Sequence, residues 1–375
     1  MKRLRGHILT PQGFVDGSIE FTAAGRIDRV VGQPVSVSAV RDSAQPRLLP
    51  GFVDLHVHGG GGHDIMDGGD AAAQVAELHA RHGTTALLAT TVTAPMADLE
   101  PALVAVRAVC ENRARQAARV LGVHLEGPYI NAGKLGAQPD FARAVDAAEL
   151  ARLTDLVPVR LITLAPEMPG TLDVIESLVA AGHRVQLGHT LGSYDDGVQA
   201  LAHGASGFTH LFNAMTGLHH RAPGMVGAAL AHAQYGEIIP DLLHVHPGAI
   251  RVALRAIPCL YCVTDSTAAT GMPDGEYRLG RHRVTKCLGG VRLADGTLAG
   301  STLTMDQALR NLVNVIGLDL DDASRRVSTF AADHIGATDR GRLTPGAWGD
   351  VVVLDRDLQV TGVWVEGRSI DAGFA

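Results

Sequence analysis

Short apolar runs alternate with longer amphipathic segments along most of the chain. The runs that read as strands are residues 52–57, 85–91, 120–126, 159–165, 184–188, 207–211, 237–245 and 260–264. Between most of them, apolar residues recur at spacings of three and four, as amphipathic helices require, in residues 71–82, 96–118, 172–181, 194–203 and 247–256. Eight strands alternating with helices over about 280 residues predict an α/β fold, a (β/α)8 TIM-like barrel. An open doubly wound sheet is disfavoured because no G-x-G-x-x-G follows the first run.

The two ends of the chain have a different pattern, with short alternating runs around turns. Neither end can bury a sheet face alone, so we expect the two to pair into one small β-sandwich domain. The predicted division is residues 1–49 plus 341–375 for this domain and residues 50–340 for the barrel. A hairpin is expected at residues 277–298, inserted after the eighth strand.

Composition narrows the classes of function. Of the 375 residues, 46% are hydrophobic and 19% are charged, which is typical of a globular protein. The net charge of −7, without a basic block, argues against a nucleic-acid partner. No apolar stretch approaches the 18 or so residues of a membrane span, so no membrane association is expected. The 4 cysteines are too scattered for a disulfide framework, and we expect a reducing, cytoplasmic location.

Side chains able to bind metal stand at the ends of several predicted strands. They are His56 and His58 on the first strand, Glu126 on the third, His189 on the fifth, His210 on the sixth and Asp265 on the eighth. All these strand ends open onto one face of a barrel, the face that carries the active site. Residues two apart on a strand point to the same side, so the two first-strand histidines can hold one cation together.

Each of these residues alone has an ordinary structural interpretation, such as a core histidine or a cap. Their coincidence at strand ends, where an uncompensated carboxylate would be costly to bury, predicts a divalent metal site. Donors without thiolate suit Zn²⁺, which we expect, but also Fe²⁺, Co²⁺ or Mn²⁺. The most economical set for one ion is Glu126, His189 and His210. The first-strand histidines would hold a second ion bridged through Glu126, which leaves Asp265 free as a general base.

Several motifs together resemble the N-acetylglucosamine-6-phosphate deacetylases of the amidohydrolase superfamily. They are PGFVDLHVHGGGG (50–62), HLEGPYIN (124–131), GHT (188–190), THLFNAM (209–215), PGMVGAAL (223–230), CVTDSTAATG (262–271) and AGSTLTMDQALRNLV (299–313). The resemblance covers nearly the whole chain in order. It implies hydrolysis of the acetamide of N-acetyl-D-glucosamine 6-phosphate to glucosamine 6-phosphate and acetate, in amino-sugar catabolism. It also implies that HLEGP, GHT and THLFNAM supply the catalytic metal ligands, that the H-x-H pair can hold a second ion, and that Asp265 is the catalytic acid and base.

The resemblance further implies a set of residues that bind substrate. Asn213 and Ala214 would contact the sugar phosphate. His244 and Arg221 would bind the 6-phosphate, and the arginine would reach in from the neighbouring subunit of a homodimer.

Two positions depart from the family pattern. Members usually have Lys-Gly-Ala-His after HLEGP, with a histidine that polarises the substrate carbonyl, whereas this chain has Gln138 there. Gln138 can donate a hydrogen bond but cannot carry positive charge. Members also usually have Asp-Gly-x-His before the phosphate site, where this chain has Leu242 in place of glycine. The first departure shifts oxyanion stabilisation towards the metal, and the second bears on the sugar or phosphate preference. The choice between the gluco and galacto substrates stays open, because the stereochemistry of one hydroxyl is recognised by pocket geometry.

Two other functions stay open. Cyclic-amide hydrolases of the same superfamily often bridge two metals with a carboxylated lysine at the end of the fourth strand. Residues 159–165 contain no lysine, which favours the deacetylase. A non-catalytic barrel that serves as a scaffold would be expected to lose metal ligands, yet every one is present.

Overall fold

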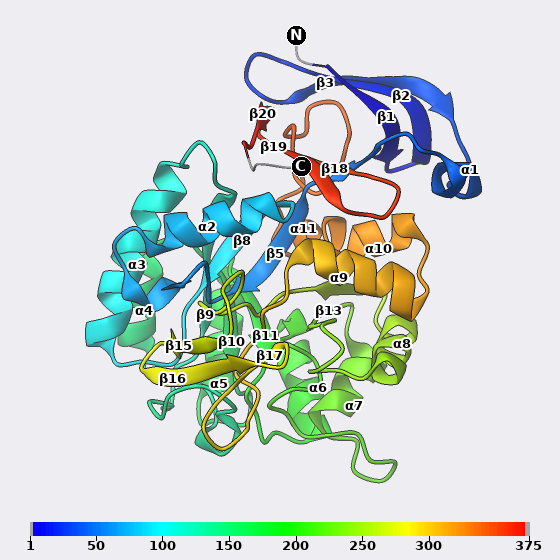
Figure 1. Cartoon of the computed structure of the whole chain (residues 1–375). Helices are drawn as coiled ribbons and strands as arrows, with labels where there is room; N and C mark the ends of the chain where they lie inside the picture. The colour runs from blue at the N-terminus through cyan, green and yellow to red at the C-terminus, as the bar shows by residue number, and fades with distance from the viewer. Residues whose placement is uncertain (1–2, 372–375) are drawn as a thin grey trace.

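The computed structural model describes residues 3–371 and has a barrel with a separate sheet packed on one end (Figure 1). The barrel strands are β5 (Phe52–Val57), β8 (Thr84–Thr90), β9 (Arg119–Glu126), β10 (Val159–Leu164), β11 (Arg184–Leu187), β12 (Gly207–Phe208), β13 (Tyr235–Ile238) and β14 (Cys259–Cys262). A parallel sheet runs in the order β12-β11-β10-β9-β8-β5, and β13 pairs in parallel with β14. The ring closes because the Leu211 amide donates to Glu237 O at 2.9 Å and Val57 forms a parallel bridge with Ser266.

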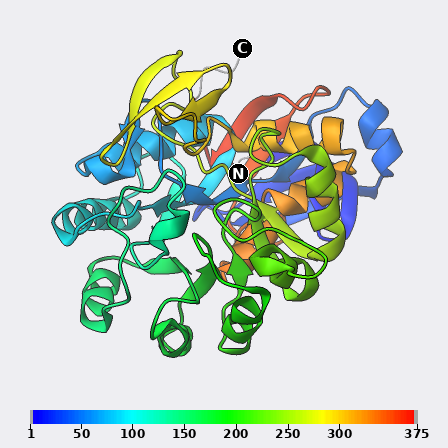
Figure 2. The ribbon, with the colours of Figure 1, turned by 90° about the horizontal axis from the view of Figure 1, so that it is seen from below.

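Helices surround the strands on the outside of the barrel (Figure 2). They are α2 (Ala71–Arg81), α3 (Met96–Glu111), α4 (Ala147–Leu156), α5 (Thr171–Ala180), α6 (Tyr194–Ala202), α7 (Gly224–His232), α8 (Pro247–Ala256), α9 (Met305–Asn311), α10 (Leu320–Arg326) and α11 (Thr329–His334). Local signals fix several starts: Ser193 and Asp196 form a capping box before α6. Proline opens α8, where its fixed φ suits the first helical turn. The barrel strands are almost fully buried, as a ring covered by helices requires.

Both ends of the chain build one sheet of the order β20-β19-β18-β4-β1-β2-β3. Its strands are β1 (Arg3–Thr10), β2 (Gly13–Phe21), β3 (Ile27–Pro34), β4 (Arg47–Pro50), β18 (Val351–Leu354), β19 (Val360–Val365) and β20 (Arg368–Ser369). The sheet folds around its own apolar core, to which β1, β2, β3, β4 and β18 all contribute. The predicted fold class, a barrel with a small β domain from both termini, is confirmed. The division at residues 49/50 and 340/341 stays a prediction, and its residues 1–2 and 372–375 lie outside the described part.

The segment after the eighth strand forms more than the expected hairpin. It is a three-stranded antiparallel sheet of β15 (Gly275–Leu279), β16 (His282–Cys287) and β17 (Gly290–Arg292). Its apolar face has a small core of its own, which includes Leu279, Val284 and Val291 and also Val92 from the loop after β8. We call these three strands the inserted sheet. The remaining short elements are α1 (Val37–Asp42), β6 (Gly59–Gly60), β7 (His63–Asp64), η1 (Ile65–Asp67), η2 (Ala132–Lys134) and the π-helical η3 (Leu312–Ile316).

The expected seventh strand is wrong beyond Ile238. Residues 239–245 form a loop instead, because the Asp241 carboxylate accepts the amides of Leu243 and His244 and so closes a local turn. Helix α3 also ends at Glu111, earlier than expected, since the Arg113 guanidinium donates to Ala117 O and stabilises a non-helical turn. Among residues 3–371, no helix is both long and apolar enough to cross a membrane.

Candidate metal centre and active site

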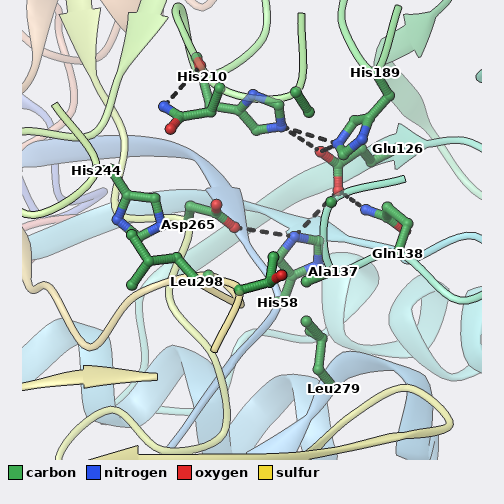
Figure 3. A pocket seen from close by; sticks show the side chains of 15 residues that line it. His58, Glu126, Ala137, Gln138, His189, His210, His244, Asp265, Leu279 and Leu298 are labelled. Carbon is green, nitrogen blue, oxygen red and sulfur yellow. Dashed lines mark hydrogen bonds and ion pairs between the residues drawn. The ribbon is translucent and has the colours of Figure 1, made fainter. Parts of the chain in front are cut away.

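The six strand-end residues singled out in the sequence lie together at one end of the barrel. Figure 3 shows five of them, all but His56. The terminal sheet joins the start of β5 through β4, so the site occupies the opposite end, where β5 finishes. The ligand-bearing side chains are buried: Glu126 is 1% exposed and Asp265 is 8% exposed. Segments far apart in the sequence therefore deliver two carboxylates and four imidazoles to one small region.

The first donor group is Glu126, His189 and His210. Glu126 Oε1 lies 3.1 Å from His189 Nε2 and 3.1 Å from His210 Nε2, and the two nitrogens are 3.0 Å apart. The His189 Nδ1–H donates to Lys134 O at 2.8 Å, so in the neutral ring the Nε2 lone pair faces the other two donors. Three donor atoms that lie 3.0 to 3.1 Å from one another are suited to hold a cation.

The second donor group is His56, His58 and Asp265. The Nε2 atoms of the two histidines are 3.1 Å apart, and Asp265 Oδ1 lies 3.5 Å from His56 Nε2 and 3.2 Å from His58 Nε2. Glu126 Oε2 lies 3.2 Å from His58 Nε2, so the two oxygens of Glu126 face the two groups. This arrangement leaves room for one or two divalent ions with a shared glutamate.

Charge in the site is organised around ionised carboxylates. Burial by itself raises the pKa of Glu126, but His56 and the hydrogen bonds from His189 and His210 outweigh it and hold that pKa well below its usual range. Burial opposes protonation of His58, yet Asp265 and Glu126 raise its pKa to about 9. Positive charge between Glu126 and Asp265 would therefore be stabilised, and a divalent cation would supply it.

The backbone at the strand ends is strained. His189, His210 and Asp265 have φ values of 49°, 30° and 50°, in the left-handed region that residues with a Cβ rarely adopt. Each such conformation costs on the order of 1 kcal/mol and persists only where the surroundings enforce it. All three residues belong to the donor groups, so the unfavourable backbone conformations coincide with the candidate site.

A cavity of about 200 Å³ opens beside the donor groups. Its polar lining includes His58, Glu126, Gln138, Asn213 and His244, and Ala214 also contributes. The inserted sheet and the segment that leads from it to α9 add an apolar side through Leu279 and Leu298, and Thr297 and Gly300 also line the cavity. The size and mixed lining suit a small polar molecule with one apolar group.

Gln138 is held in a fixed orientation. Its Oε1 accepts the Thr93 amide at 2.6 Å, and its Nε2 donates to Glu126 Oε2. The sequence predicted that Gln138 would face the substrate. In the structure one N–H is directed to Glu126, and one remains for a molecule in the cavity.

His244 lies at the far side of the cavity, where its Nδ1 is 2.6 Å from Asp241 Oδ2. Burial lowers the pKa of His244, but Asp241 outweighs it and raises that pKa above its usual value. Leu242 has a φ of 69°, which is the conformation that glycine adopts easily. The turn that carries His244 therefore keeps a left-handed residue despite the leucine side chain.

Arg221 does not line this cavity. It lies in the exposed loop between β12 and α7, where its amide hydrogen-bonds with His219 Nδ1 at 3.3 Å. A role for Arg221 in the site of a second subunit stays a prediction.

Three residues at the site escaped sequence reasoning: Glu237, Asp241 and Thr93. Glu237 is completely buried, and its Oε2 lies 3.0 Å from His56 Nδ1. A carboxylate inside an apolar strand was the signal that could have identified it, because such burial requires a partner. Thr93 acts through its amide alone, for which the sequence carries no signal.

Comparisons with known proteins agree with this geometry. Residues 47–370 match the family model described as the amidohydrolase family. The chain is 39% identical over 368 residues to an N-acetylgalactosamine-6-phosphate deacetylase of Escherichia coli O157:H7, covering 96% of this chain and 97% of the relative. It is 39% identical over 330 residues to an N-acetylglucosamine-6-phosphate deacetylase of Vibrio furnissii, covering 86% and 82%. A Mycobacterium smegmatis N-acetyl-D-glucosamine-6-phosphate deacetylase mutant, solved with N-acetyl-D-glucosamine-6-phosphate, superposes with a TM-score of 0.89 at 35% identity over 98% of each chain.

Proposed function

The chain belongs to the amidohydrolase family, and we propose that it hydrolyses the acetamide of N-acetyl-D-glucosamine 6-phosphate to glucosamine 6-phosphate and acetate. The observation that carries the proposal is the convergence of Glu126, His189 and His210 beside Asp265, at the edge of a cavity sized for a small polar molecule. The names of the relatives supply the substrate class, an N-acetylated amino-sugar phosphate.

We assign the catalytic cation to Glu126, His189 and His210, and a second ion to His56 and His58, with Glu126 between them. Zinc is the ion that we propose, and the same donor chemistry, imidazole and carboxylate without thiolate, also suits Fe²⁺, Co²⁺ or Mn²⁺. A divalent ion held by these residues would lower the pKa of a bound water molecule to about 7 and polarise an amide carbonyl.

Asp265 is the proposed general base and acid. Burial raises its pKa, but His56 and His58 outweigh burial and hold that pKa below its usual value, so the carboxylate is ionised at neutral pH. In that state it accepts a proton from the attacking water and then delivers it to the departing amine, which is a poor leaving group without protonation. The free N–H of Gln138 is the protein's candidate donor to the developing oxyanion.

The phosphate end is assigned to His244, with Asn213 and Ala214 in contact with the sugar phosphate. Asp241 favours the protonated form of His244, whose ring lies across the cavity from Gln138 (Figure 3). Arg221 of a second subunit would complete the phosphate site in a homodimer, since a guanidinium binds phosphate through two parallel hydrogen bonds. A cytoplasmic location, suggested by the scattered cysteines, is also part of this proposal.

The galacto epimer is a second candidate substrate. The Escherichia coli O157:H7 relative, 97% of which aligns with this chain, is named as a deacetylase of N-acetylgalactosamine 6-phosphate. Its identity to this chain, 39%, equals that of the N-acetylglucosamine-6-phosphate deacetylase of Vibrio furnissii. The test is an amine-release assay with both epimeric 6-phosphates and with unphosphorylated N-acetylglucosamine, with zinc added or chelated. Metal-dependent amine release from N-acetyl-D-glucosamine 6-phosphate supports the proposal. A clear preference for the galacto 6-phosphate would instead make the galacto epimer the proposed substrate. No release from any of them refutes the function.

A further inference from the structure

Glu237, on β13, is a buried carboxylate that the proposed reaction does not use. It is 0% exposed, and among residues 3–371 its ion pair is with His56 alone. Glu237 Oε2 accepts from His56 Nδ1 at 3.0 Å and from the His210 amide at 3.2 Å. Its Oε1 accepts the Tyr261 hydroxyl at 3.4 Å. Burying an ionised carboxylate without an arginine or lysine beside it costs free energy, so Glu237 depends on positive charge at or next to His56.

The contact with His56 decides which ring nitrogen faces the site. A carboxylate oxygen can only accept, so His56 must place its proton on Nδ1. In the neutral ring the lone pair then lies on Nε2, which points to His58 Nε2 at 3.1 Å and to Asp265 Oδ1 at 3.5 Å. The ring is also packed edge-on against His58 and His124, with centroids 4.9 Å and 4.6 Å away. Glu237 therefore sets both the tautomer and the orientation of His56.

The first donor group does not depend on this contact for its tautomers. His189 is oriented by its own hydrogen bond to Lys134 O, and Glu126 by Gln138. The link from Glu237 to His210 involves only the backbone amide and not the imidazole. Loss of Glu237 should thus affect a cation at His56 and His58 far more than a cation at Glu126, His189 and His210.

We propose that Glu237 is a positioning residue that makes the second cation site. By holding the Nδ1 proton of His56 and adding negative charge behind the ring, it raises the affinity of the His56–His58 pair for a divalent ion. This inference rests on the proposed metal site and goes beyond it, because it assigns the choice between one and two ions to a residue that touches neither ion. Hydrogen-bond partners of metal-binding histidines typically contribute about 10- to 100-fold to metal affinity.

The test is a zinc titration of the metal-free full-length protein, followed by measurement of bound zinc per chain. Glu237→Leu removes the acceptor, and Glu237→Gln keeps a carbonyl that can accept the Nδ1–H but removes the charge. Tyr261→Phe is the matched control, since it removes a buried hydroxyl on the other side of Glu237 and leaves the contact with His56 intact. Circular dichroism on the same samples checks folding.

The wild type should bind two zinc ions, and Glu237→Leu should keep the tighter one while the weaker one loses about 10- to 100-fold in affinity. Glu237→Gln should lie between the two, and Tyr261→Phe should match the wild type. Two unchanged sites in both Glu237 variants would overturn the inference, as would a single wild-type site or an equal loss in Tyr261→Phe. If Glu237→Leu does not fold, Glu237→Gln alone decides. A wild type that binds no zinc and releases no acetate would instead refute the proposed function.

Discussion

Asp265→Asn isolates the proton-transfer part of the account from metal binding. The asparagine has nearly the same shape but cannot accept the proton of the attacking water. A positioned general acid and base typically contributes 10²–10⁴-fold, so the barrier should rise by about 2.7–5.5 kcal/mol. The first donor group of Glu126, His189 and His210 does not include Asp265, so one ion should stay bound.

The assay measures acetate release from N-acetyl-D-glucosamine 6-phosphate and, in the same sample, the amount of bound zinc per chain. The loss should fall on kcat, with little change in KM, because the proton moves only in the transition state. Asp54→Asn is the matched control. Asp54 is also buried near the site, but it hydrogen-bonds Thr264 at 2.7 Å and does not line the cavity. Burial raises its pKa to about 7, so a neutral side chain there is tolerated and turnover should change only a few-fold.

Near-normal turnover in Asp265→Asn would remove this residue from the mechanism. An equal loss in Asp54→Asn would show that any change in buried charge disturbs the site, and the assignment of Asp265 would fail. Loss of all zinc in Asp265→Asn would contradict the assignment of the first ion to the other three ligands.

Three further predictions concern the terminal sheet, the phosphate and the oxyanion. Glu366 is half-buried, which raises its pKa, but hydrogen bonds from Arg119 and Arg340 outweigh this and lower that pKa from 4.5 to about 2. The stabilisation that ionised Glu366 gives is therefore complete above pH 4.5 and is lost as the pH falls towards 2. Glu366→Gln should lower the free energy of unfolding, measured in urea, by about 2 kcal/mol at pH 7 and by progressively less in acid. A difference that does not change with pH would refute this. Arg221→Ala should lower kcat/KM for the phosphorylated substrate at least tenfold more than kcat/KM for the unphosphorylated sugar. Equal effects on the two substrates would exclude a role of Arg221 in phosphate binding. Gln138→Leu should lower kcat about 10²- to 10³-fold with zinc content retained, because the oxyanion donor is lost. An unchanged kcat would exclude Gln138 as the oxyanion donor.

Sequence periodicity predicted the barrel well because its strands are buried runs and its helices have one apolar face. His56, His58 and Glu126 could be placed for the same reason, since each ends such a run. The sequence could not predict contacts between residues on different strands. That Glu237 lies behind His56 depends on closure of the ring, which brings β13 close to β5 with only β14 between them, and spacing along the chain does not reveal this. The loop after Ile238 was missed because the side chain of Asp241 forms a local turn within an apolar stretch.

The most direct test of the central claim is to count zinc and measure acetate release together, as zinc is returned to metal-free protein. The claim is that residues from separate strand ends bind one catalytic cation. Activity should rise with the first ion bound per chain and disappear on chelation, and His189→Ala should lose both the ion and the activity. Full activity in protein without any divalent metal, or a His189→Ala variant that keeps both, would contradict it.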